Sequence, residues 1–241
     1  MLGLPDAIIA CLFDLDGVLT ETAKVHAAAW KQMFDAYLRE VQGDGFEPFT
    51  EHDYDAHVDG KTRADGVRSF LEARGIAYDE ALVRELGDRK NEIVLKIIHE
   101  QGVEPYAGSV RYLHAARDAG LRRAVVSSSA NCHDVLVAAG IEDLLEARID
   151  GVTVEERHLR GKPAPDMFLE GARALGVEPA RAAVFEDALA GVEAGRAGNF
   201  GHVVGVDRVG QAQALREHGA DVVVKDLAEL LVAPPATFDR K

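Results

Sequence analysis

Strand-length apolar runs alternate with helical segments from Pro105 onward, and this alternation limits the possible folds more than any other feature. The apolar runs that predict strands lie at residues 124–126, 147–149, 182–185, 202–206 and 221–224. The segments between most of these runs carry apolar residues at helical spacing. Such alternation is typical of a doubly wound parallel sheet with helices on both faces. The sequence therefore predicts an α/β fold.

A further apolar run, Ala7–Phe13, has strand length and belongs with this sheet. Residues 21–104 show helical periodicity but no strand pattern. Within them, the Gly- and acid-rich stretch 42–59 predicts a mobile loop. We therefore expect a discontinuous α/β core at 1–20 and 105–241, with a small helical cap domain inserted at 21–104.

The charge balance restricts the possible partners. The chain has 41 acidic and 27 basic residues and a formal net charge of −14, which argues against nucleic acid and anionic membranes. Cys11 and Cys132 have neither metal-site spacing nor a disulfide framework, which favours the reducing cytoplasm. No apolar run reaches the ~20 residues of a membrane helix. We expect a cytoplasmic monomer or weak homo-oligomer.

Two aspartates, Asp14 and Asp16, follow the first predicted strand, and Gly17 then allows the chain to turn. Carboxylates at a strand end are too costly to bury unpaired, so they need a cation, a proton or a solvent-filled cleft. One interpretation makes Asp14 a nucleophile and metal ligand and Asp16 a general acid/base. The alternative is an ordinary Asp-x-Asp-Gly turn.

Polar residues also follow other predicted strands, where ligands of doubly wound sheets bind. These residues are Ser127, Ser128, Ser129, Asn131, Glu186 and Asp187, and the loop before Pro163 adds Lys162. Each has a simpler explanation: the serines as helix caps, the acids as first-turn residues favoured by the helix dipole, and the lysine as a surface residue. Together, however, acids, a hydroxyl and a lysine predict magnesium-assisted phosphoryl transfer.

Each of these groups has a chemical role in that hypothesis. Carboxylates are the ligands that Mg²⁺ prefers, and the metal group is expected to comprise Asp14, Asp16, Glu186 and Asp187. Ser127 would donate its hydroxyl to a phosphoryl oxygen, and Lys162 would supply positive charge. Attack by Asp14 would form an aspartyl-phosphate and divide one difficult transfer into two easier ones.

These residues resemble the four motifs of the haloacid dehalogenase superfamily of phosphoryl-transfer enzymes. The motifs are Asp14-Leu15-Asp16-Gly17-Val18-Leu19-Thr20, Ser127, Lys162-Pro163-Ala164-Pro165-Asp166 and Glu186-Asp187. The resemblance implies a Rossmann-like core and Mg²⁺ as the cofactor. A helical cap placed directly after the first motif is similar to that of the β-phosphoglucomutase-like subfamily.

The same resemblance implies several residues that bind a phosphorylated sugar. They are His26 near the start of the cap, Gly60 and Arg63 in a cap loop, Lys90 in a cap helix, and Ser128, Ser129 and Asn131 in the core. Arg63 would grip the phosphate that is not being transferred. Lys90 lies four residues after Leu86 at the edge of an apolar stripe, which suits a lysine that faces a cleft. A packed or exposed helix histidine remains the alternative for His26.

Two functions of this family fit the residues. Arg63, Lys90 and Asn131 favour a phosphomutase that converts a β-hexose 1-phosphate to the 6-phosphate. Asp59 and Ala130 stand where such mutases usually have lysines, and they favour the alternative, a sugar-phosphate phosphatase with the same core chemistry.

Two further classes remain. A signalling receiver also forms an aspartyl-phosphate, but receivers are about half this length and lack the Asp-x-Asp of the first strand. A catalytically silent phosphosugar-binding protein is the other, although no motif residue is missing here.

Overall fold

The computed structural model describes residues 2–231, within which six parallel strands form one sheet in the order β3-β2-β1-β4-β5-β6. The strands are β1 (Ala10–Phe13), β2 (Arg122–Val126), β3 (Ala147–Ile149), β4 (Ala182–Glu186), β5 (His202–Val206) and β6 (Val222–Val224). This confirms the predicted doubly wound sheet. The strand order reverses beside β1, between β1 and β4, and such switch points are where ligands bind.

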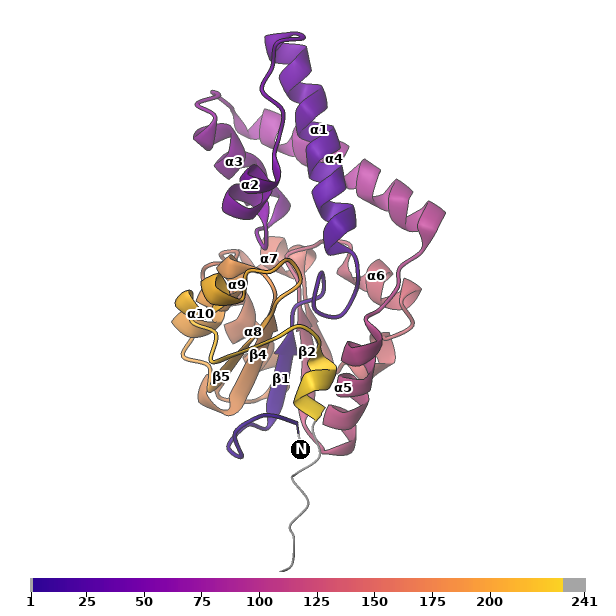
Figure 1. Ribbon diagram of the computed structural model, residues 1–241, viewed down its shortest axis with the longest axis vertical. Coiled ribbons are helices and arrows are strands. Elements are labelled where there is room, and N and C mark those ends of the chain that lie inside the picture. The colour runs from indigo at the N-terminus through magenta and orange to yellow at the C-terminus, as the bar shows by residue number, and fades with distance from the viewer. Residues whose placement is uncertain (1, 232–241) are drawn as a thin grey trace, which may run out of the picture.

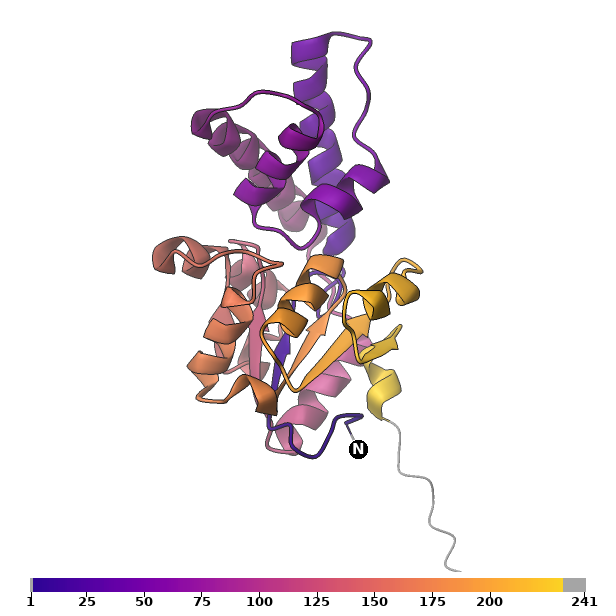
Figure 2. The same cartoon turned by 90° about the vertical axis from the view of Figure 1, so that its left-hand side faces the viewer.

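Helices cover both faces of the sheet (Figures 1 and 2). They are α5 (Ala107–Asp118), α6 (Cys132–Ala138), α7 (Gly151–Arg157), α8 (Asp166–Leu175), α9 (Leu189–Ala197) and α10 (Ala212–Glu217). Short 3-10 turns lie at Glu142–Leu144, Pro179–Arg181 and Leu227–Leu231. The sequence did not predict α7, because this helix buries none of its residues and so lacks an apolar stripe. Its start is fixed by Asp150, whose carboxylate accepts a hydrogen bond from the Thr153 N–H at 2.9 Å.

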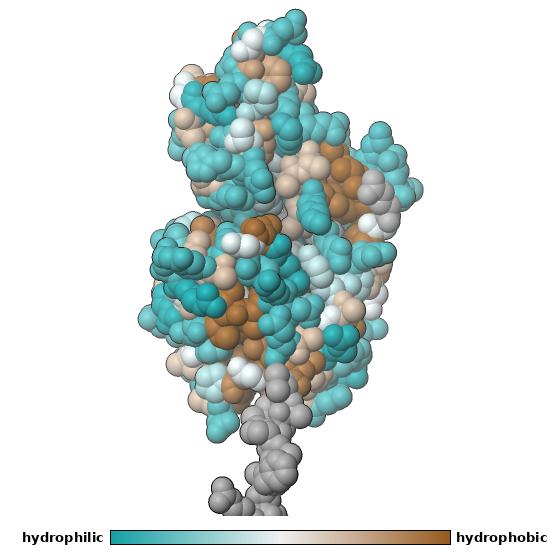
Figure 3. Space-filling view, in the orientation of Figure 1, coloured by the Kyte–Doolittle hydropathy of each residue, from teal (hydrophilic) through white to brown (hydrophobic). Residues whose placement is uncertain are grey.

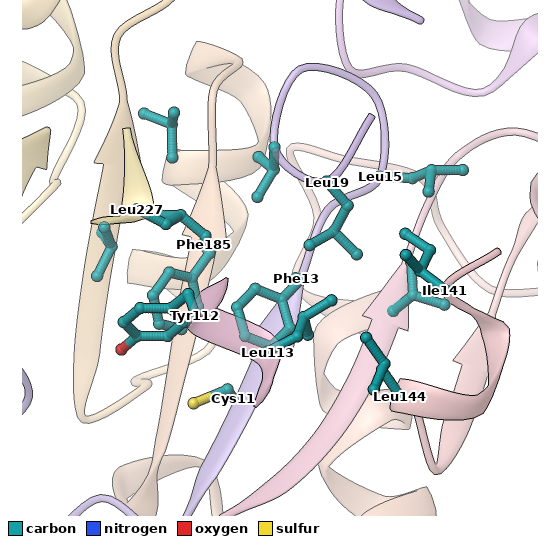
Figure 4. Close-up of a cluster of buried hydrophobic side chains, with 14 of the residues drawn as sticks. Cys11, Phe13, Leu15, Leu19, Tyr112, Leu113, Ile141, Leu144, Phe185 and Leu227 are labelled. Carbon is teal, nitrogen blue, oxygen red and sulfur yellow. The ribbon is translucent and has the colours of Figure 1, made fainter. Parts of the chain in front are cut away.

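Strand β1 lies at the centre of the core and is buried on both faces. Cys11 and Phe13 pack into one hydrophobic cluster, whereas Ala10 and Leu12 pack into another on the opposite face. Figure 4 shows Phe13 beside Phe185 and Tyr112, and its ring stacks on that of Phe185 with centroids 4.5 Å apart. Burial on both faces explains why β1 reads as a continuous apolar run.

The residues between β1 and α5 are helical, as predicted, and lie beyond the ends toward which the strand arrows point (Figures 1 and 2). Their elements are α1 (Ala23–Gln42), α2 (Glu51–Asp53), a π-helical turn (Tyr54–Val58), α3 (Arg63–Ala73) and α4 (Glu80–Gln101). An aromatic cluster of Trp30, Phe34, Phe49 and Phe70 holds these helices together.

The prediction of a loop at 42–59 is wrong for residues 51–58, because these residues are helical. The Thr50 hydroxyl accepts a hydrogen bond from the Asp53 N–H, and the Asp53 carboxylate accepts one from the Thr50 N–H, which together form a capping box. Phe49 is buried, and its N–H donates to the Asp35 carboxylate at 2.8 Å. These contacts attach the segment to the core of the cap.

Two linkers join the cap to the sheet side by side. Thr20 forms an isolated bridge with Pro105, and the Tyr106 N–H donates to the Leu19 carbonyl at 2.9 Å. We propose that the domain boundaries follow these linkers, with a core at 1–20 and 105–241 and a cap at 21–104. Residue 1 and residues 232–241 of that range lie outside the described residues.

The face seen in Figure 3 is largely hydrophilic, with apolar areas confined to parts of the core and the cap junction. None of the helices within residues 2–231 has the length and hydrophobicity that are required to cross a bilayer.

Candidate active site

A cavity of about 620 Å³ lies between the cap and the carboxyl ends of the strands. Most of the predicted site residues line it: Asp14, Asp16, His26, Gly60, Arg63, Lys90, Ser128, Ser129, Asn131, Glu186 and Asp187. The other two, Ser127 and Lys162, are buried. The structure thus brings together residues that are far apart in sequence.

Lys162 joins the ends of β1 and β4. Its Nζ lies 2.5 Å from Asp14 Oδ1 and 2.5 Å from Glu186 Oε1, and it also donates to the Val126 carbonyl at 3.1 Å. Burial opposes the charge on Lys162, but the two carboxylates raise the pKa of its ammonium above the usual range. Lys162 is therefore a buried counter-ion rather than the surface lysine of the simpler explanation.

Three carboxylates converge where these strands end. Asp14, Glu186 and Asp187 each offer an oxygen, and these oxygens lie within 4.8 Å of one another. Burial raises the pKa of Asp14 and of Asp187, and neighbouring carboxylates raise both further. A hard divalent cation would relieve this repulsion, and the three oxygen donors fit Mg²⁺.

The Asp16 side chain departs from the predicted metal group. Its carboxylate does not belong to the converging set; it accepts a hydrogen bond from the Thr22 hydroxyl and lies 3.5 Å from His26 Nε2. The reason is that β1 ends at Phe13 and the chain bends at Leu15, between the two aspartates, so that they meet different partners. The chain then turns at Gly17. Gly17 has a φ of +88°, and a Cβ at this position would lie 1.8 Å from Asp187 Oδ2, so only glycine fits.

His26 and Lys90 extend this contact into the cap. Lys90 Nζ lies 2.8 Å from His26 Nδ1 and 5.0 Å from the centroid of the Trp30 ring. Burial and the proximity of Lys90 together lower the pKa of His26 to about 4, and burial lowers that of Lys90 to about 7. Both side chains line the cavity, and the His26 side chain is largely buried there.

The serines after β2 have separate partners. The Ser127 hydroxyl accepts a hydrogen bond from the Ser129 N–H at 3.1 Å, and its own hydrogen makes no bond to a described residue. Ser128 instead donates to the Gly60 carbonyl of the cap at 2.8 Å. A Cβ on Gly60 would lie 3.0 Å from the Ala188 Cβ, so the cap loop approaches the core closely.

Arg63 and Asn131 meet at a residue that was not predicted to belong to the site. Asn91 Oδ1 accepts hydrogen bonds from Arg63 Nη2 at 3.1 Å and from Asn131 Nδ2 at 2.8 Å. The signal that could have identified Asn91 is its position beside Lys90 on α4. Cap and core therefore supply one shared cluster of hydrogen-bond donors.

Thr22 and Asp59 are further residues that sequence reasoning missed or treated as departures. The Thr22 hydroxyl bonds to Asp16 and to Thr20. Asp59 lines the cavity, and burial together with the Glu186 carboxylate raises its pKa to about 7. The short Thr20-x-Thr22 spacing was visible in the sequence, but the orientation of Asp59 depends on the unpredicted helical turn before it.

A model of the haloacid dehalogenase-like hydrolase family matches residues 8–199. The chain belongs to the haloacid dehalogenase superfamily. A β-phosphoglucomutase of Mycobacterium bovis is 55% identical over 96% of this chain and 94% of its own length. A validoxylamine A 7'-phosphate phosphatase of Streptomyces hygroscopicus subsp. limoneus is 31% identical over 91% of this chain and 94% of its own.

The crystal structure of β-phosphoglucomutase from Clostridium difficile superimposes with a TM-score of 0.77 and 27% identity, covering 92% of this chain and 93% of that one. Within the haloacid dehalogenase superfamily, the chain thus belongs to the β-phosphoglucomutase-like subfamily. It is an enzyme of the phosphotransferase and isomerase class, which excludes the receiver and the silent binding protein. Membership of this superfamily also implies a divalent metal at the acidic group.

Proposed function

We propose that this enzyme is a phosphomutase that interconverts a β-hexose 1-phosphate and the hexose 6-phosphate through a phosphoryl group carried on Asp14. The observation that carries this proposal is the presence of two polar clusters in one cavity. One is the Asp14–Lys162–Glu186 cluster, and the other is the Arg63–Asn91–Asn131 cluster. A hexose bisphosphate has two phosphates. One would lie at Asp14 beside Lys162, and the other would need the separate donors of Arg63 and Asn131.

The residues that would hold Mg²⁺ are Asp14, Glu186 and Asp187. The bound ion supplies positive charge that allows an anionic phosphate to approach an anionic carboxylate. Lys162 contributes a further positive charge, because its Nζ contacts both Asp14 and Glu186. The Ser127 hydroxyl is free to donate to a phosphoryl oxygen.

Phosphoryl transfer then proceeds in two balanced steps. A sugar hydroxyl attacks the phosphorus on Asp14, the new sugar O–P bond forms as the bond to Asp14 breaks, and Asp16 takes the hydroxyl proton. After the bisphosphate turns over in the site, Asp14 attacks the other phosphorus and Asp16 returns the proton to the departing sugar oxygen. The enzyme regains its phosphoryl group, so the net reaction is an isomerisation.

The cap contributes position and the exclusion of water. The Thr22 hydroxyl donates to the Asp16 carboxylate, and His26, which lies 2.8 Å from Lys90 Nζ, places its Nε2 3.5 Å from the same carboxylate. The bond from Ser128 to the Gly60 carbonyl fastens the cap loop to the core. A closed cavity protects the aspartyl-phosphate from hydrolysis, which is the condition for a mutase.

A second candidate function is hydrolysis of a sugar phosphate, with water as the acceptor. Two cavity residues favour it, because Asp59 and Ala130 supply no positive charge where mutases of this family usually have lysines. The similarity to a validoxylamine phosphate phosphatase is in line with this candidate. The core chemistry at Asp14 is the same in both.

Phosphorus NMR distinguishes the two functions. The enzyme is supplied with β-glucose 1-phosphate, Mg²⁺ and a trace of β-glucose 1,6-bisphosphate, with Asp14→Asn and the α-anomer as controls. We expect glucose 6-phosphate from the β-anomer with the wild-type enzyme only. Release of inorganic phosphate with no glucose 6-phosphate would reject the mutase and support the phosphatase.

A further inference from the structure

The segment that follows β5, residues 207–211, contacts both loops that carry the acidic cluster. Arg208 Nε donates to the Gly17 carbonyl at 2.6 Å, and Gln211 Nε2 donates to the Asp187 carbonyl at 3.0 Å. Gly17 belongs to the turn between Asp14 and the cap, whereas Asp187 follows β4. One short segment thus fixes the backbone on two sides of the site.

This segment is itself held firmly. The buried Asp207 carboxylate accepts hydrogen bonds from the Gly210 N–H at 2.7 Å and the Gln211 N–H at 2.8 Å. Arg208 Nη1 donates to the Lys225 carbonyl at 2.7 Å, just beyond β6. The Arg208 guanidinium is therefore anchored to the sheet at one nitrogen and to the Gly17 turn at another.

The same guanidinium stacks on the cap linker. The Arg208 Cζ lies 3.5 Å from the centroid of the Tyr106 ring. Tyr106 follows Pro105, which pairs with Thr20 of the other linker, and the Tyr106 N–H donates to the Leu19 carbonyl. Arg208 thus contacts the place where both linkers enter the core.

Gly17 cannot move without affecting the reacting groups. Its N–H donates to the Thr20 carbonyl at 2.8 Å, and its Cα lies so close to Asp187 that a Cβ would overlap the carboxylate. Asp16 precedes it directly. A shift of the Gly17 turn would therefore displace Asp16 and press on Asp187, and small displacements of reacting groups are costly.

We propose that Arg208 is a positioning residue that couples the cap linker at Tyr106 to the Gly17 turn. Asp16 then takes the position required for proton transfer only when Tyr106 packs against Arg208. Arginine suits this role because a planar guanidinium can donate in two directions while its face stacks on an aromatic ring. Lysine could keep the charge but could not make the three contacts together. The kinetic part of this inference rests on the proposed function.

The test compares Arg208→Ala and Arg208→Lys with a matched control, Arg123→Ala. Arg123 is buried, and its Nε donates to the Leu144 carbonyl at 2.8 Å, but it lies near the start of β2, away from the carboxyl ends of the strands. Hydrogen exchange of residues 14–22 and 104–106 is measured without substrate, and kcat and KM are measured with β-glucose 1-phosphate.

Both Arg208 variants are expected to exchange faster in residues 14–22 and 104–106 and to lose about tenfold or more in kcat, with KM changed less than about threefold. Arg123→Ala should lose stability without either effect. Three results would overturn the proposal. They are hydrogen exchange at the wild-type rate in these segments of the Arg208 variants, full kcat in Arg208→Lys, and an equal loss of kcat in Arg123→Ala. If the wild-type enzyme transfers no phosphoryl group, the proposed function fails, and hydrogen exchange alone still decides the coupling by Arg208.

Discussion

Lys90 Nζ lies 2.8 Å from His26 Nδ1, although 64 residues separate them and both side chains are largely buried. The pair spans α1 and α4 and ends 3.5 Å from Asp16. A buried lysine is costly for folding, so its presence here indicates a functional requirement rather than a structural one.

Replacing this lysine by methionine should stabilise the fold. The pKa of Lys90 falls from 10.5 to about 7 on folding because of burial, so the unfolded chain binds the proton between these values and the folded chain does not. Stability therefore decreases as pH falls from 10.5 to 7 and changes no further below 7. Lys90→Met should gain about 1–4 kcal/mol at pH 7 and less at pH 9.5, while kcat/KM falls at least about 100-fold.

Urea unfolding at the two pH values measures this gain, with Lys96→Met as the matched control on the exposed face of the same helix. A Lys90→Met protein that is less stable than the wild type at both pH values would show that the lysine serves the fold.

Removing Lys162 should make the enzyme dependent on Mg²⁺ for stability. Lys162→Met leaves Asp14 and Glu186 without their buried counter-ion, and loss of one partner of such a pair costs about 3–5 kcal/mol. Mg²⁺ should therefore raise the melting temperature of this variant more than that of the wild type. Thermal unfolding in MgCl₂ and in EDTA measures the difference, and Lys225→Met is a surface control. An equal rise in melting temperature in variant and wild type would show that Mg²⁺ does not compensate for the loss of Lys162, and would contradict the prediction.

The capping box of α2 should give the cap a defined acid sensitivity. Burial opposes ionisation of Asp53, but bonds from Arg74 and Thr50 lower its pKa from 3.8 to about 2. Its stabilising contribution is therefore complete above about pH 5 and is lost as pH falls toward 2, and solvent screening limits it to about 1–2 kcal/mol. Asp53→Asn should be less stable at pH 7 by about 1–2 kcal/mol, with a smaller difference at pH 3. The control Asp44→Asn, at an exposed position nearby, should match the wild type at both. If Asp53→Asn were less stable than the wild type by the same amount at pH 7 and pH 3, the link between the Asp53 pKa and stability would be contradicted.

Restoring a positive charge beside Asn131 should strengthen phosphate binding. Ala130 is exposed and lines the cavity, so Ala130→Lys places an ammonium near the Arg63–Asn91–Asn131 cluster without disturbing the core. Affinity for β-glucose 1,6-bisphosphate, measured by calorimetry on an Asp14→Asn background, should rise about 2–5-fold and decline with added salt. No change in affinity would show that the second phosphate binds elsewhere.

The centre of the site could be predicted from sequence because it depends on the sheet. Asp14, Lys162 and Glu186 belong to the ends of parallel strands or the loop beside them, and such ends meet at one edge whatever the details of packing. Position in a strand pattern was therefore enough to bring these residues together.

The cap was predicted less fully, because its contacts depend on how helices rotate and dock. The apolar spacing of residues 79–101 predicts an inward stripe of Leu82, Leu86, Ile93 and Ile97. In the structure, the buried positions of α4 instead include Val83, Leu86, Lys90 and Val94. That rotation faces Lys90 toward His26 and brings Asn91 to Arg63. Helical periodicity fixes the position of a buried stripe only to within about one residue. Which residues are buried then depends on the helices that α4 packs against.

The most direct test of the whole account is to find where phosphorus is bound during turnover. The enzyme is mixed with Mg²⁺ and β-glucose 1,6-bisphosphate, quenched in acid, digested and analysed by mass spectrometry. The account predicts one phosphoryl group on the peptide that contains Asp14, formed fast enough to be on the reaction path, and none in Asp14→Asn. Turnover by Asp14→Asn at the wild-type rate, or a phosphoryl group found on another residue, would contradict it.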